Sequence, residues 1–144
     1  MVHGTHNALP DKRNEDILIY VNGELFPRNE AKISVFDSGY LVGDGIWEAM
    51  RLHDGVLVFE KEHLNRLWTA AATVGMDLKM TKSELMAEVW KTLNANKMTD
   101  GISTCIFNHI FHRTSRCCKL NIKFDIVLVK HDLLYHPQSN DVFI

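Results

Sequence analysis

The chain lacks the features that mark nucleic-acid-binding, membrane-spanning and secreted proteins. Its formal net charge is only −2 over 144 residues, so it has no excess of Lys and Arg of the kind that binds a phosphate backbone or anionic lipid. No apolar run approaches the ~20 residues that cross a bilayer. The N-terminus has neither an apolar signal core nor the acid-poor, arginine-rich pattern of a transit peptide. We therefore expect no nucleic-acid partner, no membrane partner and a cytoplasmic location.

Cysteine is also scarce. Three cysteines, an odd number, do not make a closed disulfide framework and fit a reducing compartment. The remaining composition is ordinary, with 46% hydrophobic and 24% charged residues. It excludes disorder, collagen-like repeats and a coiled coil as descriptions of the whole chain. The length leaves room for one domain, or for one domain and a tail.

Three common residue types are missing from the last part of the chain. Gly ends at Gly101, Ala ends at Ala95 and Glu ends at Glu88, whereas all three cysteines lie beyond residue 102. A compact domain normally uses Gly in turns, and Ala and Glu in helices, along its whole length. The expected parts are a mobile N-terminal arm over 1–16, a folded domain over 17–102 and a tail of foreign composition over 103–144.

Two tight-turn signals predict two β-hairpins. Asn22-Gly23 and Asp54-Gly55 suit a type I′ turn, because both of its central residues need a positive φ. The flanking runs are apolar and short, as strands are. The strands are expected over 17–21 and 24–26 in the first hairpin, and over 46–53 and 56–59 in the second.

Two amphipathic helices are predicted to follow the hairpins. Apolar residues recur with helical spacing over 62–75. Thr81 and Glu84 then form a capping-box pattern at the start of a second helix. Runs at 106–111 and 122–129 are candidates for further strands. The expected fold class is α+β, a small two-layer domain of antiparallel strands and hairpins with two packed helices, followed by the tail.

The strand over 46–53 presents a candidate pocket wall. Strand alternation puts Trp47, Ala49 and Arg51 on one face, where a large aromatic and an arginine flank a small residue. The alternative is an edge strand with Arg51 in water and Trp47 half-buried.

Arg66 is the second candidate, near the start of the first predicted helix. A guanidinium there can hold a phosphate dianion with two parallel hydrogen bonds. The alternative is a surface ion pair with Glu62, four residues earlier on the same helix.

Two stretches carry a resemblance to a known family. They are YVNGELFPRNEAKISVFDSGYLVGDGIWEAMRLHDG at 20–55 and FEKEHLNRLWTAAATVGMDL at 59–78. With the helix that follows them, they resemble the N-terminal small domain of class IV (fold type IV) pyridoxal-phosphate aminotransferases. That family includes branched-chain and D-amino-acid aminotransferases and aminodeoxychorismate lyases.

The resemblance implies a cofactor, a reaction and roles for particular residues. The cofactor is pyridoxal 5′-phosphate, and the reaction transfers an amino group between an amino acid, of the branched-chain or D type, and a 2-oxo acid. Arg66 matches the arginine that contacts the cofactor phosphate. Trp47 matches an aromatic on the substrate side, with Ala49 and Arg51 after it on the same strand face, and Tyr40 matches a position near the entrance. The family also implies a homodimer, or pairing with a full-length relative.

The resemblance ends after Gly101. In the family, the lysine that forms a Schiff base with the cofactor and the acid beside the ring nitrogen both belong to the part that finds no match here. Lys130 is the only tail lysine in an apolar run, and we expect it to be a surface or edge residue. We therefore assign no catalytic residue and expect a truncated, catalytically incomplete aminotransferase. The alternative is a non-enzymatic protein that pairs with a full-length relative.

A tail-borne zinc site is a further alternative. His109, His112, Cys117 and Cys118 are zinc-ligand types in the order H-x2-H-x4-C-C. Structural zinc sites normally use C-x2–4-C and H-x3–5-H pairs, which this spacing fits poorly.

Overall fold

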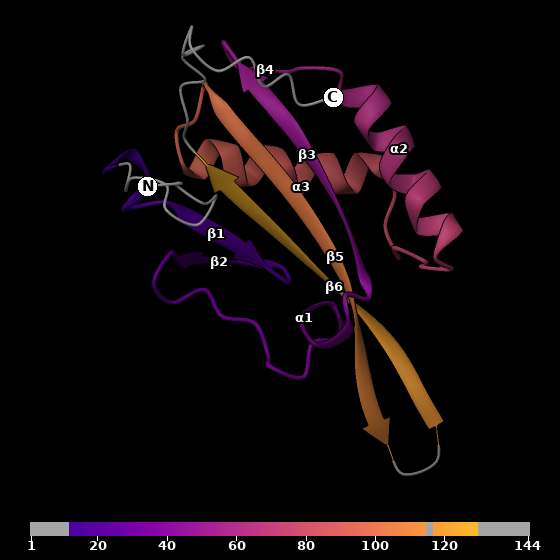
Figure 1. Cartoon of the computed structure of the whole chain (residues 1–144). Helices are drawn as coiled ribbons and strands as arrows, with labels where there is room; N and C mark the ends of the chain where they lie inside the picture. The colour runs from indigo at the N-terminus through magenta and orange to yellow at the C-terminus, as the bar shows by residue number, and fades with distance from the viewer. Residues whose placement is uncertain (1–11, 115–116, 130–144) are drawn as a thin grey trace, which may run out of the picture.

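A computed structural model describes the backbone of residues 12–114 and 117–129, and the side chains of 12–107 and 124–126 (Figure 1). Among these residues, no helix has the length and apolar character that a membrane span requires.

The core of the fold is an antiparallel sheet of six strands in the order β2-β1-β6-β5-β3-β4. The strands are β1 (Leu18–Val21), β2 (Glu24–Pro27), β3 (Gly45–His53), β4 (Val56–Leu57), β5 (Gly101–Thr114) and β6 (Cys117–Val129). The helices are a 3-10 turn, η2 (Lys12–Asn14), and α1 (Ser38–Val42), α2 (Glu60–Thr73) and α3 (Lys82–Ala95). The α+β class expected from the sequence is confirmed.

Both predicted hairpin turns are present, between β1 and β2 and between β3 and β4. Asn22 and Gly23 have φ values of 50° and 104°, and Asp54 and Gly55 have values of 47° and 73°. These left-handed conformations explain why the chain uses Asn, Asp and Gly at these positions.

Both predicted helices form, and their caps follow from the sequence. At the start of α3, the Thr81 hydroxyl accepts from the Glu84 N–H, and the Glu84 carboxylate accepts from the Thr81 N–H at 2.7 Å. At the end of α3, the Asn96 side chain is bonded to both backbone groups of Leu18, which ties the helix to β1. The one-turn helix α1 is not among the predicted elements; Asp37 caps it by accepting from the Gly39 N–H at 2.9 Å.

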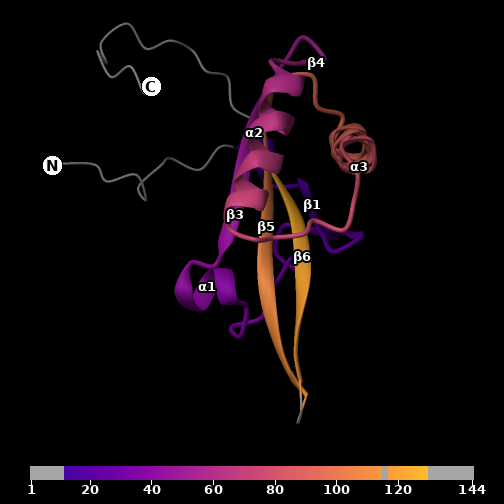
Figure 2. The same cartoon turned by 90° about the vertical axis from the view of Figure 1, so that its right-hand side faces the viewer.

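The two long helices, α2 and α3, pack on the sheet. In Figure 1, α3 crosses behind the sheet and α2 runs beside β3, and in Figure 2 α3 and the short α1 lie on opposite sides of the sheet seen nearly edge-on. The sheet face toward α2 and α3 carries the buried residues of β3, which are Ile46, Glu48, Met50 and Leu52. The apolar ones share one core with buried residues of both helices, such as Leu67 and Leu93.

The central strands β5 and β6 come from the segment whose composition differs from the rest. β5 pairs with β3 and with β6, and β6 pairs in turn with β1. Cys105, Phe107 and Phe124 are buried in the core, and the rings of Phe107 and Phe124 stack with centroids 4.5 Å apart. The boundary expected at residue 102 therefore falls inside a strand, and the chain up to Val129 continues the fold. That 103–144 has a different origin stays a prediction.

Beyond Asn108, β5 pairs only with β6 among the described strands, and Figure 1 shows this hairpin extending past the sheet. The zinc-ligand candidates lie on it. The side chains of His109, His112, Cys117 and Cys118 lie outside the described ones, so the tail-borne zinc site stays a prediction. Lys130 and the first part of the expected arm lie outside the described residues.

Candidate functional site

Glu48 is a charged residue in the buried face of β3. It is 3% exposed and lies between the buried Ile46 and Met50. A carboxylate in such surroundings is stable only when it accepts hydrogen bonds. Glu48 accepts four: from Arg66 Nε to Oε2 at 2.7 Å, and to Oε1 from Arg66 Nη2 at 2.6 Å, His63 Nδ1 at 2.9 Å and the Ala49 N–H at 3.0 Å.

Arg66 and His63 reach Glu48 from α2. They are three residues apart, so they lie on the same face of the helix. The Arg66 side chain is 71% exposed, whereas that of Glu48 is 4% exposed. One edge of the guanidinium is thus fixed on a buried carboxylate and the rest faces water. The surface pair of Arg66 with Glu62 considered from the sequence is not the one that forms, because the partner of Arg66 is Glu48.

The cluster keeps Glu48 ionised. Burial alone would raise the pKa of Glu48, but the hydrogen bonds from Arg66 and His63 outweigh it, so the pKa lies below the ordinary value. The hydrogen bond and the charge of Glu48 raise the pKa of Arg66. An ionised carboxylate only accepts hydrogen bonds, so we assign the proton of His63 to Nδ1.

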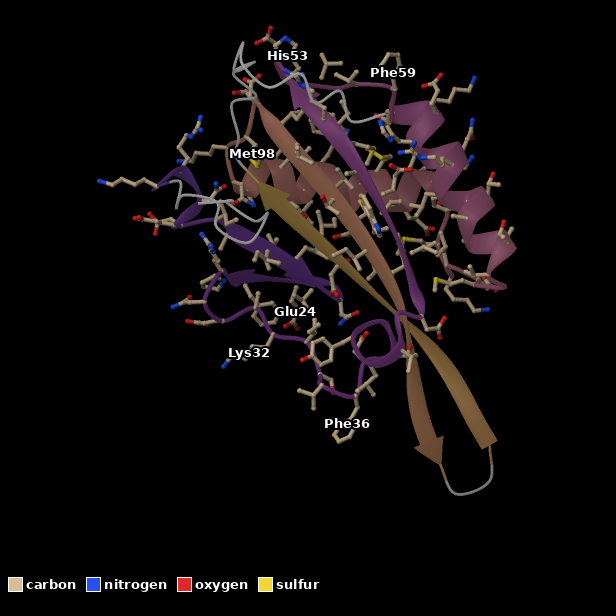
Figure 3. All side chains as sticks on the ribbon, in the orientation of Figure 1. Glu24, Lys32, Phe36, His53, Phe59 and Met98 are labelled. Carbon is tan, nitrogen blue, oxygen red and sulfur yellow. The ribbon has the colours of Figure 1, made fainter. Side chains whose placement is uncertain are left out.

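A hollow of about 260 Å³ lies beside this cluster, lined by Phe59, Glu62, His63 and Arg66. Figure 3 shows Phe59 at the N-terminal end of α2, and this ring is 70% exposed. Glu48 is not part of the lining. It contacts two lining residues, Arg66 and His63, through hydrogen bonds.

The other expected site residues are not in this hollow. Trp47 is 70% exposed and Tyr40 is 68% exposed, and Ala49 and Arg51 lie on the same outer face of β3 as Trp47. The structure therefore separates the expected phosphate contact from the expected substrate-side residues. The edge-strand alternative expected Arg51 in water and Trp47 half-buried. Arg51 is exposed, and Trp47 is more exposed than that alternative expected.

A second polar group lies at the far end of β3. Ligand atoms of His53, Asp54 and Asp100 are within 4.8 Å of one another. Asp100 Oδ1 lies 3.1 Å from His53 Nδ1 and accepts from the Asp54 N–H at 3.3 Å, and these bonds lower the pKa of Asp100. These hydrogen bonds connect the β3–β4 turn to the residue before β5. The three residues therefore have a role in stabilising the fold.

The hollow fits a phosphate contact but not a complete cofactor site. Arg66 has five N–H donors; two of them donate to Glu48, and Nη2 also lies 3.4 Å from His63 Nδ1, so the two donors of Nη1 are the ones best placed for an anion. No lysine among the described residues lines the hollow. The chain would thus hold a phosphorylated cofactor at one end only.

Pattern reasoning found Arg66 but missed the carboxylate that holds it. Strand alternation places Glu48 on the same face as Ile46, Met50 and Leu52. A single acid in phase with three apolar residues signals a buried charge, and a buried charge needs a cation nearby. That signal points to an arginine on the helix that covers this face.

Comparison with known proteins finds a likeness to aminotransferases both in sequence and in fold. No family model matches the chain. Over 82 residues it is 43% identical to a protein of Methanocaldococcus jannaschii described as a putative branched-chain-amino-acid aminotransferase, and over 83 residues it is 35% identical to D-alanine aminotransferase of Bacillus licheniformis. These matches cover 57% and 58% of this chain, but only 28% and 29% of the relatives.

Solved structures extend the likeness in fold. The branched-chain amino acid aminotransferase of Escherichia coli matches 79% of this chain and 40% of its own, with a TM-score of 0.71 and 19% identity. The branched-chain enzyme of Thermobaculum terrenum, in its PLP-form, matches 80% and 40%, with a TM-score of 0.64 and 14% identity. The fold thus matches over more of the chain than the sequence does. Its matched part resembles the N-terminal portion of class IV aminotransferases.

Proposed function

We propose that this chain carries the small domain of a class IV pyridoxal-phosphate aminotransferase, and that it serves amino-group transfer between an amino acid and a 2-oxo acid. The observation that carries the proposal is Arg66, which stands where the resemblance expects a phosphate contact and is fixed beside a hollow. The likeness to branched-chain and D-alanine aminotransferases supports the reaction class. A branched-chain or D-amino acid as substrate, and a location in the cytoplasm, belong to the same proposal.

In this proposal each residue has a limited task. Bound pyridoxal phosphate supplies an electron sink for the reaction. Arg66 binds the phosphate group, and Glu48 and His63 hold its guanidinium in place. Trp47 and Arg51, on the outer face of β3, border the substrate, and Tyr40 lies near the entrance.

The chain is proposed to be incomplete as a catalyst. One charge-assisted hydrogen bond contributes about 1.5–3 kcal/mol, whereas micromolar binding needs about 8 kcal/mol. Arg66 alone therefore does not retain the cofactor. The chain matches less than a third of the length of the Methanocaldococcus jannaschii and Bacillus licheniformis relatives, and we expect the remaining cofactor contacts to come from a protein part that corresponds to the rest of their length.

The test is a chimera in which residues 17–102 replace the matching part of the Methanocaldococcus jannaschii relative. We expect the chimera to transfer amino groups from a branched-chain or D-amino acid to a 2-oxo acid, and the purified chain alone to show no such activity. A folded but inactive chimera would contradict the small-domain assignment. Activity of the chain alone would contradict its incompleteness.

A second candidate function is pairing with a full-length relative. It rests on exposed apolar residues in and around α1 and at the start of β3, namely Val35, Phe36, Tyr40, Leu41, Val42 and Trp47. Figure 3 shows Phe36 at the outer end of the loop before α1. Exposed apolar residues mark an interaction site where they form one surface. Co-purification with a full-length relative, lost when Phe36 and Val42 are changed to Ser, would support it.

A further inference from the structure

We propose that Glu48 is the positioning residue of the Arg66 anion site, and that it increases the affinity of this site for a phosphate group although it is itself an anion. The inference rests on the proposed function, which supplies the phosphate. It adds a role for a residue that never touches the ligand.

The geometry of the pair that Glu48 forms with Arg66 is the first argument. Glu48 receives Nε and Nη2 of Arg66 on its two different oxygens, at 2.7 and 2.6 Å. Two parallel bonds of this kind fix the plane and the rotation of a guanidinium. The N–H donors that do not bond to Glu48 belong to Nη1 and Nη2, of which Nη2 also lies 3.4 Å from His63 Nδ1, and Arg66 is one of the residues that line the hollow.

The rigidity of the carboxylate is the second argument. Glu48 lies on a strand that is paired along its length with β5, and its side chain is 4% exposed. His63 and the Ala49 N–H also hold its Oε1. Glu48 therefore restrains the long side chain of Arg66, which is 71% exposed. Ordering such a side chain costs conformational entropy, and the bonds to Glu48 remove this cost before the anion arrives.

Charge alone predicts the opposite effect, which makes the inference testable. Glu48 and Glu62 are both acids near the same anion site, and each repels a phosphate. Only Glu48 is bonded to Arg66, whereas Glu62 lines the hollow. Replacing Glu62 by Gln removes repulsion and leaves the bonds to Arg66 intact. Replacing Glu48 by Gln removes repulsion and also weakens these bonds.

The experiment titrates the full chain with inorganic phosphate and follows the Arg66 Nε–H signal and the backbone amides of α2 by NMR. We expect Glu48→Gln to weaken phosphate binding by about two- to tenfold and Glu62→Gln to strengthen it. If Glu48→Gln also strengthens binding, or leaves it unchanged, the positioning role is wrong.

A second variant avoids the risk that a core substitution unfolds the chain. Arg66→Lys keeps the charge on an exposed side chain, but an ammonium cannot make the two parallel bonds to Glu48. We expect it to weaken phosphate binding as Glu48→Gln does, and unchanged binding would contradict the inference. Arg66→Gln separates the two claims. If it abolishes binding while Glu48→Gln does not weaken it, only the positioning role fails. If it has no effect, the phosphate contact of the proposed function fails as well.

Discussion

At the scale of single residues, the site depends on a buried charge. Glu48 occupies a core position of β3, and its four hydrogen bonds come from three residues on two elements. Removing one partner of such a cluster leaves the others without a bond, which costs more than the bond itself contributes. Arg66 is exposed and regains water, so most of the cost falls on the buried side of the cluster.

The lowered pKa of Glu48 predicts how stability depends on pH. A carboxyl whose folded pKa lies below its unfolded pKa stabilises the fold above the unfolded pKa, and this contribution is lost as the pH falls through the folded value. We expect Glu48→Gln to reduce the free energy of unfolding near neutral pH, and the difference from the wild type to shrink in acid of about pH 3. Urea unfolding at both pH values measures this. A difference that is the same at both would contradict it.

Cys105 provides a residue-scale test of the β5 position. Burial, with a further contribution from the charge of Glu48, raises the pKa of this thiol to about 12. At about pH 8, where an ordinary thiol is substantially ionised, this buried thiol stays protonated. We expect iodoacetamide to label Cys105 only when the chain is unfolded in urea, as peptide mass spectrometry would show. Rapid labelling of the native chain would contradict burial of β5.

At the scale of elements, short sequence motifs correctly predicted the turns and the helix cap. The turns at Asn22-Gly23 and Asp54-Gly55 and the capping box at Thr81 all form, because each depends on a few neighbouring residues. The helix α1 was missed because it is one turn long, and its Asp37 cap lies among glycines that also suit a loop. The site was half predicted, since the strand and helix positions of Trp47 and Arg66 follow from periodicity, but the bond from Arg66 to Glu48 joins residues of different elements.

The capping box of α3 gives a direct stability prediction. Thr81→Ala removes the acceptor for the Glu84 N–H, and we expect it to lower the free energy of unfolding by about 1 kcal/mol. Ser83→Ala, at an exposed position in the same turn, is the matched control and should change it by less than about 0.5 kcal/mol. Urea denaturation followed by circular dichroism distinguishes them. Equal effects of the two substitutions would show that the cap does not stabilise the helix.

At the scale of the whole molecule, composition predicts a boundary at residue 102, and this position lies inside strand β5 of the sheet. The absence of Gly, Ala and Glu after residue 101 sets the last segment apart, yet β5 and β6 need none of these residue types and fill the middle of the sheet. Strand order is a long-range property, and sequence pattern alone does not give it. The fold matches known aminotransferase structures over 79% of the chain, whereas the sequence matches over 57%. The fold match is therefore longer than the sequence match.

The sheet order predicts what truncation does. Without β5 and β6, the β1–β2 hairpin and the β3–β4 hairpin share no hydrogen-bonded strand, and the core loses Cys105, Phe107, Phe124 and Ile126. We expect a chain that ends at Asp100 to show no cooperative unfolding transition and poor dispersion of its NMR signals. A chain of that length that unfolds cooperatively, with the α-helical signal of the full chain, would contradict the central role of β5 and β6.

The central claim is that Arg66 holds the phosphate of a pyridoxal cofactor when the rest of the enzyme is supplied. The most direct measurement compares the affinities of the chimera for pyridoxal 5′-phosphate and for pyridoxal, with Arg66 and with Arg66→Gln. The claim predicts a loss of about tenfold or more for the phosphorylated compound and no change for pyridoxal. Equal losses for both compounds, or no loss for either, would contradict it.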